Sequence, residues 1–184
     1  ITESGTDGIE ISNATVAFTN LTVTGVNLQG MYLYNTIVTL TNATLSNTGQ
    51  QGFYASASCG GTLTNVAVTT PNLSAGGFYG YHTDSTANFT LINCNIDNSL
   101  RITSAAGANS FSNTIFNNVG AFPPMVPANE VGPLFLTGGN TFNGVTPGMG
   151  VSLVAEDVSK DQTWPSTLGG QTIIYNAAAG YYSV

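Results

Sequence analysis

The chain has 184 residues, of which only 6% are charged, and its nine acidic residues outnumber its two basic residues to give a net charge of −7. Nucleic acids and anionic membranes attract basic surfaces, so this charge balance excludes both as expected partners. No stretch approaches the roughly 18 consecutive apolar residues of a membrane-spanning helix, so membrane insertion is not expected either.

The polar part of the composition is mostly Thr, Ser, Asn and Gly. These residues rank low in helix propensity and suit strands joined by tight turns. An acidic chain with few Lys residues and many Thr and Asn residues favours an extracellular or cell-surface location. The first ten residues do not form a signal peptide, so we expect a processed form or an excised piece of a longer protein.

Three kinds of segment recur in a fixed order along the chain. The first kind alternates apolar residues and occurs at residues 8–12, 30–34, 52–56, 77–81 and, more weakly, 99–103. The second and third kinds lie on either side of an Asn, at residues 16–23, 38–45, 61–68, 89–96 and 109–116. These segments share an Asn in the fifth place: Asn20, Asn42, Asn65, Asn93 and Asn113, with a sixth expected at Asn140. Successive Asn residues are 22, 23, 28, 20 and 27 residues apart, which predicts about six stacked rungs of three strands each.

Alternation with a period of two assigns the faces of these strands. In the first strands, the residues expected to point inward are Ile9, Met31, Phe53, Phe78 and Leu100, followed by Ile11, Leu33, Ala55, Gly80 and Ile102. In the second strands they are Phe18, Leu40, Leu63, Leu91 and Phe111. In the third strands they include Val23, Leu45, Val68, Ile96 and Phe116. Like residues therefore stack on like residues, and the stacked rungs form one continuous core.

The Asn residues mark a sharp bend between the second and third strands. Asn tolerates the left-handed backbone region better than other non-Gly residues, and stacked Asn side chains hydrogen-bond along a ladder. With this ladder and its three-strand rungs, the sequence over residues 8–145 resembles the pectate-lyase-like superfamily of right-handed parallel β-helices. That superfamily contains polysaccharide lyases and hydrolases, phage tailspikes, and many non-catalytic surface proteins and adhesins.

The C-terminal part is less regular. We expect the β-helix to cover residues 1–156, with a proline-rich loop at 121–136. Residues 157–184 are expected to form a cap or the start of a further β-helix module, in which Trp164 covers the end of the core. Such an end presents unpaired strand edges and must be capped or joined to something.

The outer face of the first strands is the face on which enzymes of the superfamily usually work. Alternation predicts one outward column of Glu10, Tyr32, Tyr54, Tyr79 and Arg101, and a second of Ser12, Tyr34, Ser56, Tyr81 and Thr103. His82 directly follows Tyr81, and Asp84 is two residues further on. The candidate ligand-binding residues are Tyr32, Tyr34, Tyr54, Tyr79, Tyr81, His82 and Arg101. Tyr suits sugar rings and protein interfaces, but outward aromatic stacks also stabilise a parallel sheet by themselves, and both readings stay open.

The acidic residues give no catalytic site. Glycosidic hydrolysis normally needs two carboxyl groups on either side of the bond, and only Glu10 lies on the face of the first strands. The same scatter of acids argues against a metal site, and no cofactor is expected. One enzymatic alternative remains, in which Tyr79, Tyr81, His82 and Arg101 bind an acidic sugar and abstract a proton, as in a polysaccharide lyase. We assign no catalytic residue.

The outer face of the second strands is rich in Thr. Its two outward columns are Ala17, Thr39, Thr62, Thr90 and Ser110, and Thr19, Thr41, Thr64, Ile92 and Ser112. This array is similar to that of β-helical ice-binding proteins, although Thr is also a common outward residue in parallel β-structure.

Taken together, these patterns predict a non-catalytic structural or adhesive β-helix module of an extracellular or cell-surface protein, which self-associates end to end. A polysaccharide or a surface protein is its expected ligand. The alternatives are a carbohydrate-binding or lyase-like domain that uses the Tyr-rich face, and an ice-binding protein that uses the Thr face. The two cysteines, Cys59 and Cys94, are not expected to form a disulfide.

Overall fold

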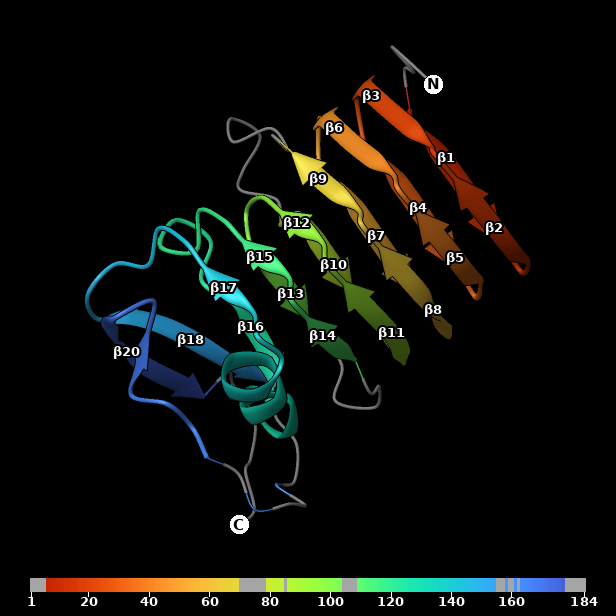
Figure 1. Cartoon of the computed structure of the whole chain (residues 1–184). Helices are drawn as coiled ribbons and strands as arrows, with labels where there is room; N and C mark the ends of the chain where they lie inside the picture. Colours follow the sequence, from red (N-terminus) through yellow and green to blue (C-terminus); the bar gives the residue numbers. More distant parts are fainter. Residues whose placement is uncertain are drawn as a thin grey trace.

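A computed structural model describes residues 6–69, 79–84, 86–103, 109–154, 158, 161 and 163–177. Figure 1 shows the chain coiling into a solenoid whose strands lie side by side from the N-terminal to the C-terminal end. Successive strands go to three different sheets, and each strand pairs with the equivalent strand of the next rung. The structure therefore confirms the predicted all-β parallel β-helix of about six rungs.

The first sheet holds nine strands and runs the whole length of the coil. Its strands, in spatial order, are β1 (Ile9–Ser12), β4 (Met31–Tyr34), β7 (Phe53–Ser56), β10 (Tyr81–Thr83), β13 (Leu100–Ile102), β16 (Met125–Pro127), β18 (Met149–Val154), β20 (Gln171–Ala177) and β19 (Thr167–Leu168). All neighbours are parallel except β19 and β20, which form an antiparallel hairpin.

The second and third sheets are shorter. The second sheet contains β2 (Thr15–Thr19), β5 (Ile37–Thr41), β8 (Cys59–Thr64), β11 (Ala87–Ile92) and β14 (Ser110–Ser112). The third contains β3 (Thr22–Val26), β6 (Thr44–Thr48), β9 (Ala67–Thr69), β12 (Asn95–Ile96), β15 (Ile115–Phe116) and β17 (Thr141–Phe142). The register of the second sheet is the predicted one, with Leu40 paired to Leu63 and Leu63 to Leu91.

Asn residues turn the chain at the bends between strands. The five residues of the predicted ladder all have positive φ, between 50° and 56°. Within the ladder, Asn42 donates to Asn20 at 3.3 Å and Asn65 donates to Asn42 at 3.0 Å. The expected sixth member is wrong, because Gly139 takes the left-handed place (φ 65°). The Asn140 side chain instead accepts from the Thr114 N–H and donates to the Phe111 and Leu134 carbonyls.

The core is one stack of apolar side chains inside the coil. Leu40, Leu63 and Leu91 are fully buried on successive rungs, as are Val23, Leu45 and Ile96 of the third sheet. Both cysteines are buried free thiols, and burial raises the pKa of each, although backbone hydrogen bonds oppose the shift. They behave as small apolar residues of the core.

The fourth rung of the first sheet differs from the prediction by three residues. Tyr81, and not Phe78, pairs with Phe53, so His82 pairs with Tyr54 and Thr83 with Ala55. Two glycine-led segments compete here, at 77–81 and 80–83. The second segment forms the strand, although one of its inward residues is the polar Thr83. Because Thr83 breaks the apolar alternation, the alternation did not predict this strand. Phe78 itself lies outside the described residues.

The described part of the C-terminal region is less regular than the rungs before it. A short 3₁₀ helix, η2 (Ala128–Glu130), leads into a π-helical turn, η3 (Pro133–Thr137), which contacts β14. Beyond it, Trp164 packs on Tyr175 of β20 with ring centroids 5.3 Å apart. Figure 1 shows β18 and β20 continuing the first sheet past the last strands of the other two.

Candidate functional site

The outer face of the first sheet carries a continuous column of mostly large side chains. Its members, in register from rung to rung, are Glu10, Tyr32, Tyr54, His82, Arg101, Met125, Ser152 and Asn176. Four of the predicted members keep their places, and His82 replaces Tyr79. A second outward column begins with Ser12, Tyr34 and Ser56.

Three rings of the first column stack on one another. The centroids of Tyr32 and Tyr54 are 5.3 Å apart with 26° between the planes, and those of Tyr54 and His82 are 4.9 Å apart with 25°. Since the rungs of a parallel sheet repeat at about 4.8 Å, the spacing of the backbone sets this stack. Because the ring faces are stacked against one another, a ligand would contact the ring edges and the polar groups at their tips.

The tips of these rings bond to the second column. The Tyr32 and Ser56 hydroxyls are 3.0 Å apart, and the Tyr54 hydroxyl donates to Asp84 Oδ2 at 2.5 Å. Burial, the hydrogen bond to Asp84 and the carboxylate charge all raise the pKa of Tyr54 far above its ordinary value. Tyr54 is therefore a neutral donor at physiological pH.

Asp84 is the centre of this hydrogen-bond network. Its Oδ1 accepts from the Thr103 hydroxyl at 2.5 Å and lies 3.0 Å from His82 Nε2. Burial on its own would raise the pKa of Asp84, but the hydrogen bonds from Thr103 and Tyr54 and the nearby imidazole outweigh it and lower the pKa. Asp84 is thus an ionised acceptor whose two oxygens are already engaged.

His82 is buried, with only 7% of its surface exposed. Its Nδ1 lies next to Gln51 and its Nε2 next to Asp84. Gln51 donates its amide N–H to His82 Nδ1 at 3.2 Å, because the Gln51 oxygen accepts from Gln29. This places the imidazole proton on Nε2, beside Asp84, although the angle there is not that of an aligned hydrogen bond. Burial lowers the pKa of His82 and the charge of Arg101 lowers it further, against the opposing effect of Asp84.

Arg101 is the only Lys or Arg side chain within the described residues. It lies between His82 and Met125 on the column, and its buried Nε has no hydrogen-bond partner in the described part of the chain. No carboxylate of the described part of the chain lies within ion-pair distance of it, since the single ion pair there joins His82 and Asp84. The partly exposed guanidinium therefore has no ion-pair partner among the described residues.

The other predicted site residues have different surroundings. Tyr34 is 47% exposed on the second column. Tyr79 lies outside the strands and donates its hydroxyl to the Pro123 carbonyl at 3.0 Å, with its ring against Phe122. The prediction for Tyr81 is wrong: it points inward, is fully buried, and donates to Asn109 at 3.2 Å.

Asp84, Thr103 and Gln51 belong to the site but were not among the predicted ligand-binding residues. Alternation placed Thr103 in the second outward column, but Asp84 and Gln51 lie outside the predicted strands, where alternation gives no direction. The available signal was the short segment 80–83, in which a glycine is followed by an inward aromatic residue, as at Gly52 and Phe53. Reading that segment as the strand places His82 and Asp84 on the outer face.

The arrangement does not supply the carboxylate pair of a glycosidase. Glu10 is three rungs from the rung of Asp84, a distance of about 14 Å, whereas the pair must lie within about 5–9.5 Å. No group of three or more His, Cys, Asp or Glu side chains among the described residues is placed to share a metal ion. The site instead offers hydroxyls, an exposed Tyr and one guanidinium, which are groups that bind a ligand.

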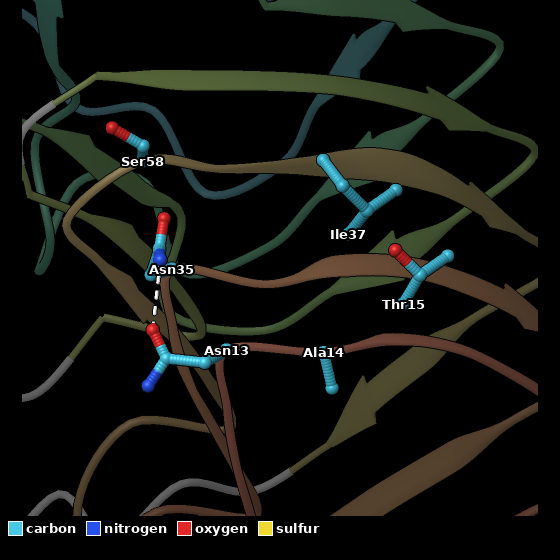
Figure 2. A pocket seen from close by; sticks show the side chains of 6 residues that line it. All are labelled: Asn13, Ala14, Thr15, Asn35, Ile37 and Ser58. Carbon is cyan, nitrogen blue, oxygen red and sulfur yellow. Dashed lines mark hydrogen bonds between the residues drawn. The ribbon is translucent and has the colours of Figure 1, made fainter.

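A shallow pocket of about 350 Å³ lies at the bend between the first and second sheets. Figure 2 shows the side chains of Asn13 and Asn35 meeting there, where Asn35 donates to Asn13 at 2.8 Å. The ladder of these two residues stops at the next rung, because Ala57 takes the left-handed place (φ 61°). The lining contains no titratable side chain, so the pocket offers no acid, base or nucleophile.

These observations define a β-solenoid with a core of stacked apolar columns and a polar aromatic column on its longest sheet. The family model described as the right handed beta helix region matches residues 1–146, and the chain therefore belongs to this family. No curated protein and no solved structure matches the chain significantly. Within the part that the structure describes, no helix has the length and apolar character needed to cross a membrane.

Proposed function

We propose that the chain is a non-catalytic structural and adhesive module of an extracellular or cell-surface protein, and that it binds an acidic polysaccharide on the outer face of its first sheet. One observation carries the proposal: the Arg101 guanidinium, which has no ion-pair partner among the described residues, lies next to the stacked rings of Tyr54 and His82. The acidic, Thr-rich composition supports the extracellular location.

The local charge of Arg101 and the hydrogen-bonding groups around it, and not the net charge of −7 that argues against nucleic acids and anionic membranes, set the expected ligand. Arg101 matches the planar carboxylate of a uronic acid or the oxygens of a sulfate, which guanidinium groups bind through two parallel N–H donors. Tyr34 offers an exposed ring, and the edges of Tyr32 and Tyr54 offer polar tips for sugar hydroxyls. Glu10 at the other end of the column repels an anion, so the acidic group is expected near Arg101 and not near Glu10.

The same geometry favours binding over lyase chemistry. Abstraction of a proton from the sugar needs a base with a free lone pair. His82 Nδ1 accepts from Gln51, and Tyr54 keeps its proton because its pKa is raised. Neither group is free to act as the base.

Binding is tested with polyuronates and sulfated glycans on an array, followed by calorimetry at low salt. We expect the wild-type chain to bind an acidic glycan and Arg101→Gln to weaken the affinity about tenfold or more, equivalent to about 1.4 kcal/mol. The matched control is Met125→Gln, the next outward position on the column, which should bind as the wild type does. Absence of binding to every acidic glycan, or equal affinity of Arg101→Gln, would refute the proposal.

The lyase alternative is tested in the same samples. β-Elimination leaves a double bond conjugated to the uronate carboxylate, which absorbs ultraviolet light. We expect no rise in absorbance on long incubation with any glycan that binds, and a rise that disappears in His82→Ala would establish an enzyme instead.

A further inference from the structure

The three outer faces of the solenoid differ in how far their polar side chains hydrogen-bond to one another. On the first sheet, Tyr54 and Thr103 both bond to Asp84. On the third sheet, Ser46 donates to Thr24 at 3.0 Å, and Asn117 and Asn143 continue a second amide ladder. The hydrogen bonds of these two faces are therefore largely made within the protein.

The second sheet is the exception. Its outward hydroxyls at Thr39, Thr41, Thr62, Thr64 and Thr90 make no hydrogen bond to any described residue. None of the five strands of this sheet contains a charged residue, although the whole chain carries a net charge of −7. This face therefore meets solvent through the hydroxyl and methyl groups of its Thr columns, beside a third, uncharged outward column of Thr15, Ile37, Gly60 and Asn88.

These Thr residues form a regular two-dimensional array. Thr39, Thr62 and Thr90 are in register on three successive strands, and Thr41 and Thr64 are in register beside them. The repeat is about 4.8 Å across the strands and about 6.7 Å between alternate residues along a strand. Ala17, Ser110, Ile92 and Ser112 continue the columns with small or uncharged side chains.

We propose that the outer face of the second sheet binds ice. Its two repeats are close to the oxygen repeats of the prism plane of ice, so hydroxyls and waters held between the methyl groups can continue the lattice. A charged group would hold its own hydration shell and disturb that order, and this face has none. The aromatic rings and the guanidinium that suit a sugar lie on the first sheet, which makes a glycan a poor fit to this one.

The test uses the intact chain in two assays: thermal hysteresis with observation of ice-crystal shape, and adsorption of the labelled protein to a growing ice hemisphere. We expect the wild-type chain to shape ice and Thr64→Tyr to lose both activities, because one large ring breaks the flat array. The matched control is Thr141→Tyr on the third sheet, where the side chain is also outward and exposed, and it should keep both. Outward Tyr residues are already tolerated at Tyr32 and Tyr54, so both variants are expected to fold, as circular dichroism would check.

The outcomes separate this face from the glycan site. Arg101→Gln should keep full ice activity, whatever its effect on glycan binding. If Thr64→Tyr fails to fold, Thr39→Lys makes the same test at an exposed position of the array and should lose both activities. The proposal would be overturned if ice grew in a solution of the wild-type chain as it does in a solution of an inert protein. It would also be overturned if the folded second-sheet variants kept full activity.

Discussion

Replacement of Thr83 by Val should stabilise the protein, which tests the corrected register of the fourth rung. Thr83 is fully buried between Ala55 and Ile102, and its hydroxyl has no hydrogen-bond partner among the residues that the structure describes. A buried hydroxyl without a partner costs about 1–3 kcal/mol, and Val keeps the branched shape while removing it. For a chain of this size, a gain of about 2 kcal/mol corresponds to a rise in Tm of about 4–8 °C.

The assay is urea unfolding followed by circular dichroism and by Trp164 fluorescence, with coincident transitions as the check on two-state behaviour. The midpoint should rise while the slope with denaturant stays constant. The matched control is Thr62→Val, an outward position on the second sheet, which should change the free energy of unfolding by less than about 0.5 kcal/mol. Equal stability of Thr83→Val and wild type would refute the inward placement of Thr83, and so would a loss.

Three further predictions concern the bends, the core and the carboxylate. Asn42→Leu should destabilise the coil by about 2–3 kcal/mol in urea unfolding, because Leu is strained at a φ of 53° and cannot bond to Asn20 or Asn65; stability equal to wild type would contradict the ladder. Tyr81→Phe should cost about 1 kcal/mol, since the buried hydroxyl donates to Asn109; an unchanged midpoint would place the ring outside. The pKa of Asp84 is lower in the folded chain, so its contribution to stability is present above the unfolded value and is lost as the pH falls below about 4. In Asp84→Asn the acid-side slope of stability against pH should flatten, and an unchanged slope would show that other groups produce it.

Local rules predicted most of the fold. Period-two alternation and Asn at a left-handed bend each act over a few residues, so the sequence predicts the inward stack of Leu40, Leu63 and Leu91 and the five ladder positions. The prediction of the sixth ladder position was wrong because Gly139 adopts the left-handed backbone as readily as Asn does. The pattern therefore pointed to the neighbouring Asn140. Backbone preference alone does not distinguish Gly139 from Asn140. The inter-rung hydrogen bond does, because the Asn113 N–H donates to the Gly138 carbonyl and so makes Gly139 the equivalent position.

The candidate site was harder to predict because its geometry is set between rungs. Register decides whether Tyr81 or His82 faces outward, and a shift of three residues exchanges the two faces of a strand. The hydrogen bonds of Asp84 with Tyr54 and Thr103, and its contact with His82, join residues from three rungs. No pattern within one rung contains that information.

The position of the register error has a physical reason. The interval between Asn65 and Asn93 is 28 residues, whereas the two intervals before it are 22 and 23. The extra residues lie between β9 of the third sheet and β10 of the first sheet, so only the register of the first sheet is affected. The second and third sheets keep their alignment, because Leu63 still pairs with Leu91 and Val68 with Ile96. An insertion at one bend can therefore change the chemistry of the first sheet, here by bringing His82 and Asp84 into the aromatic column, while the Thr array of the second sheet stays intact.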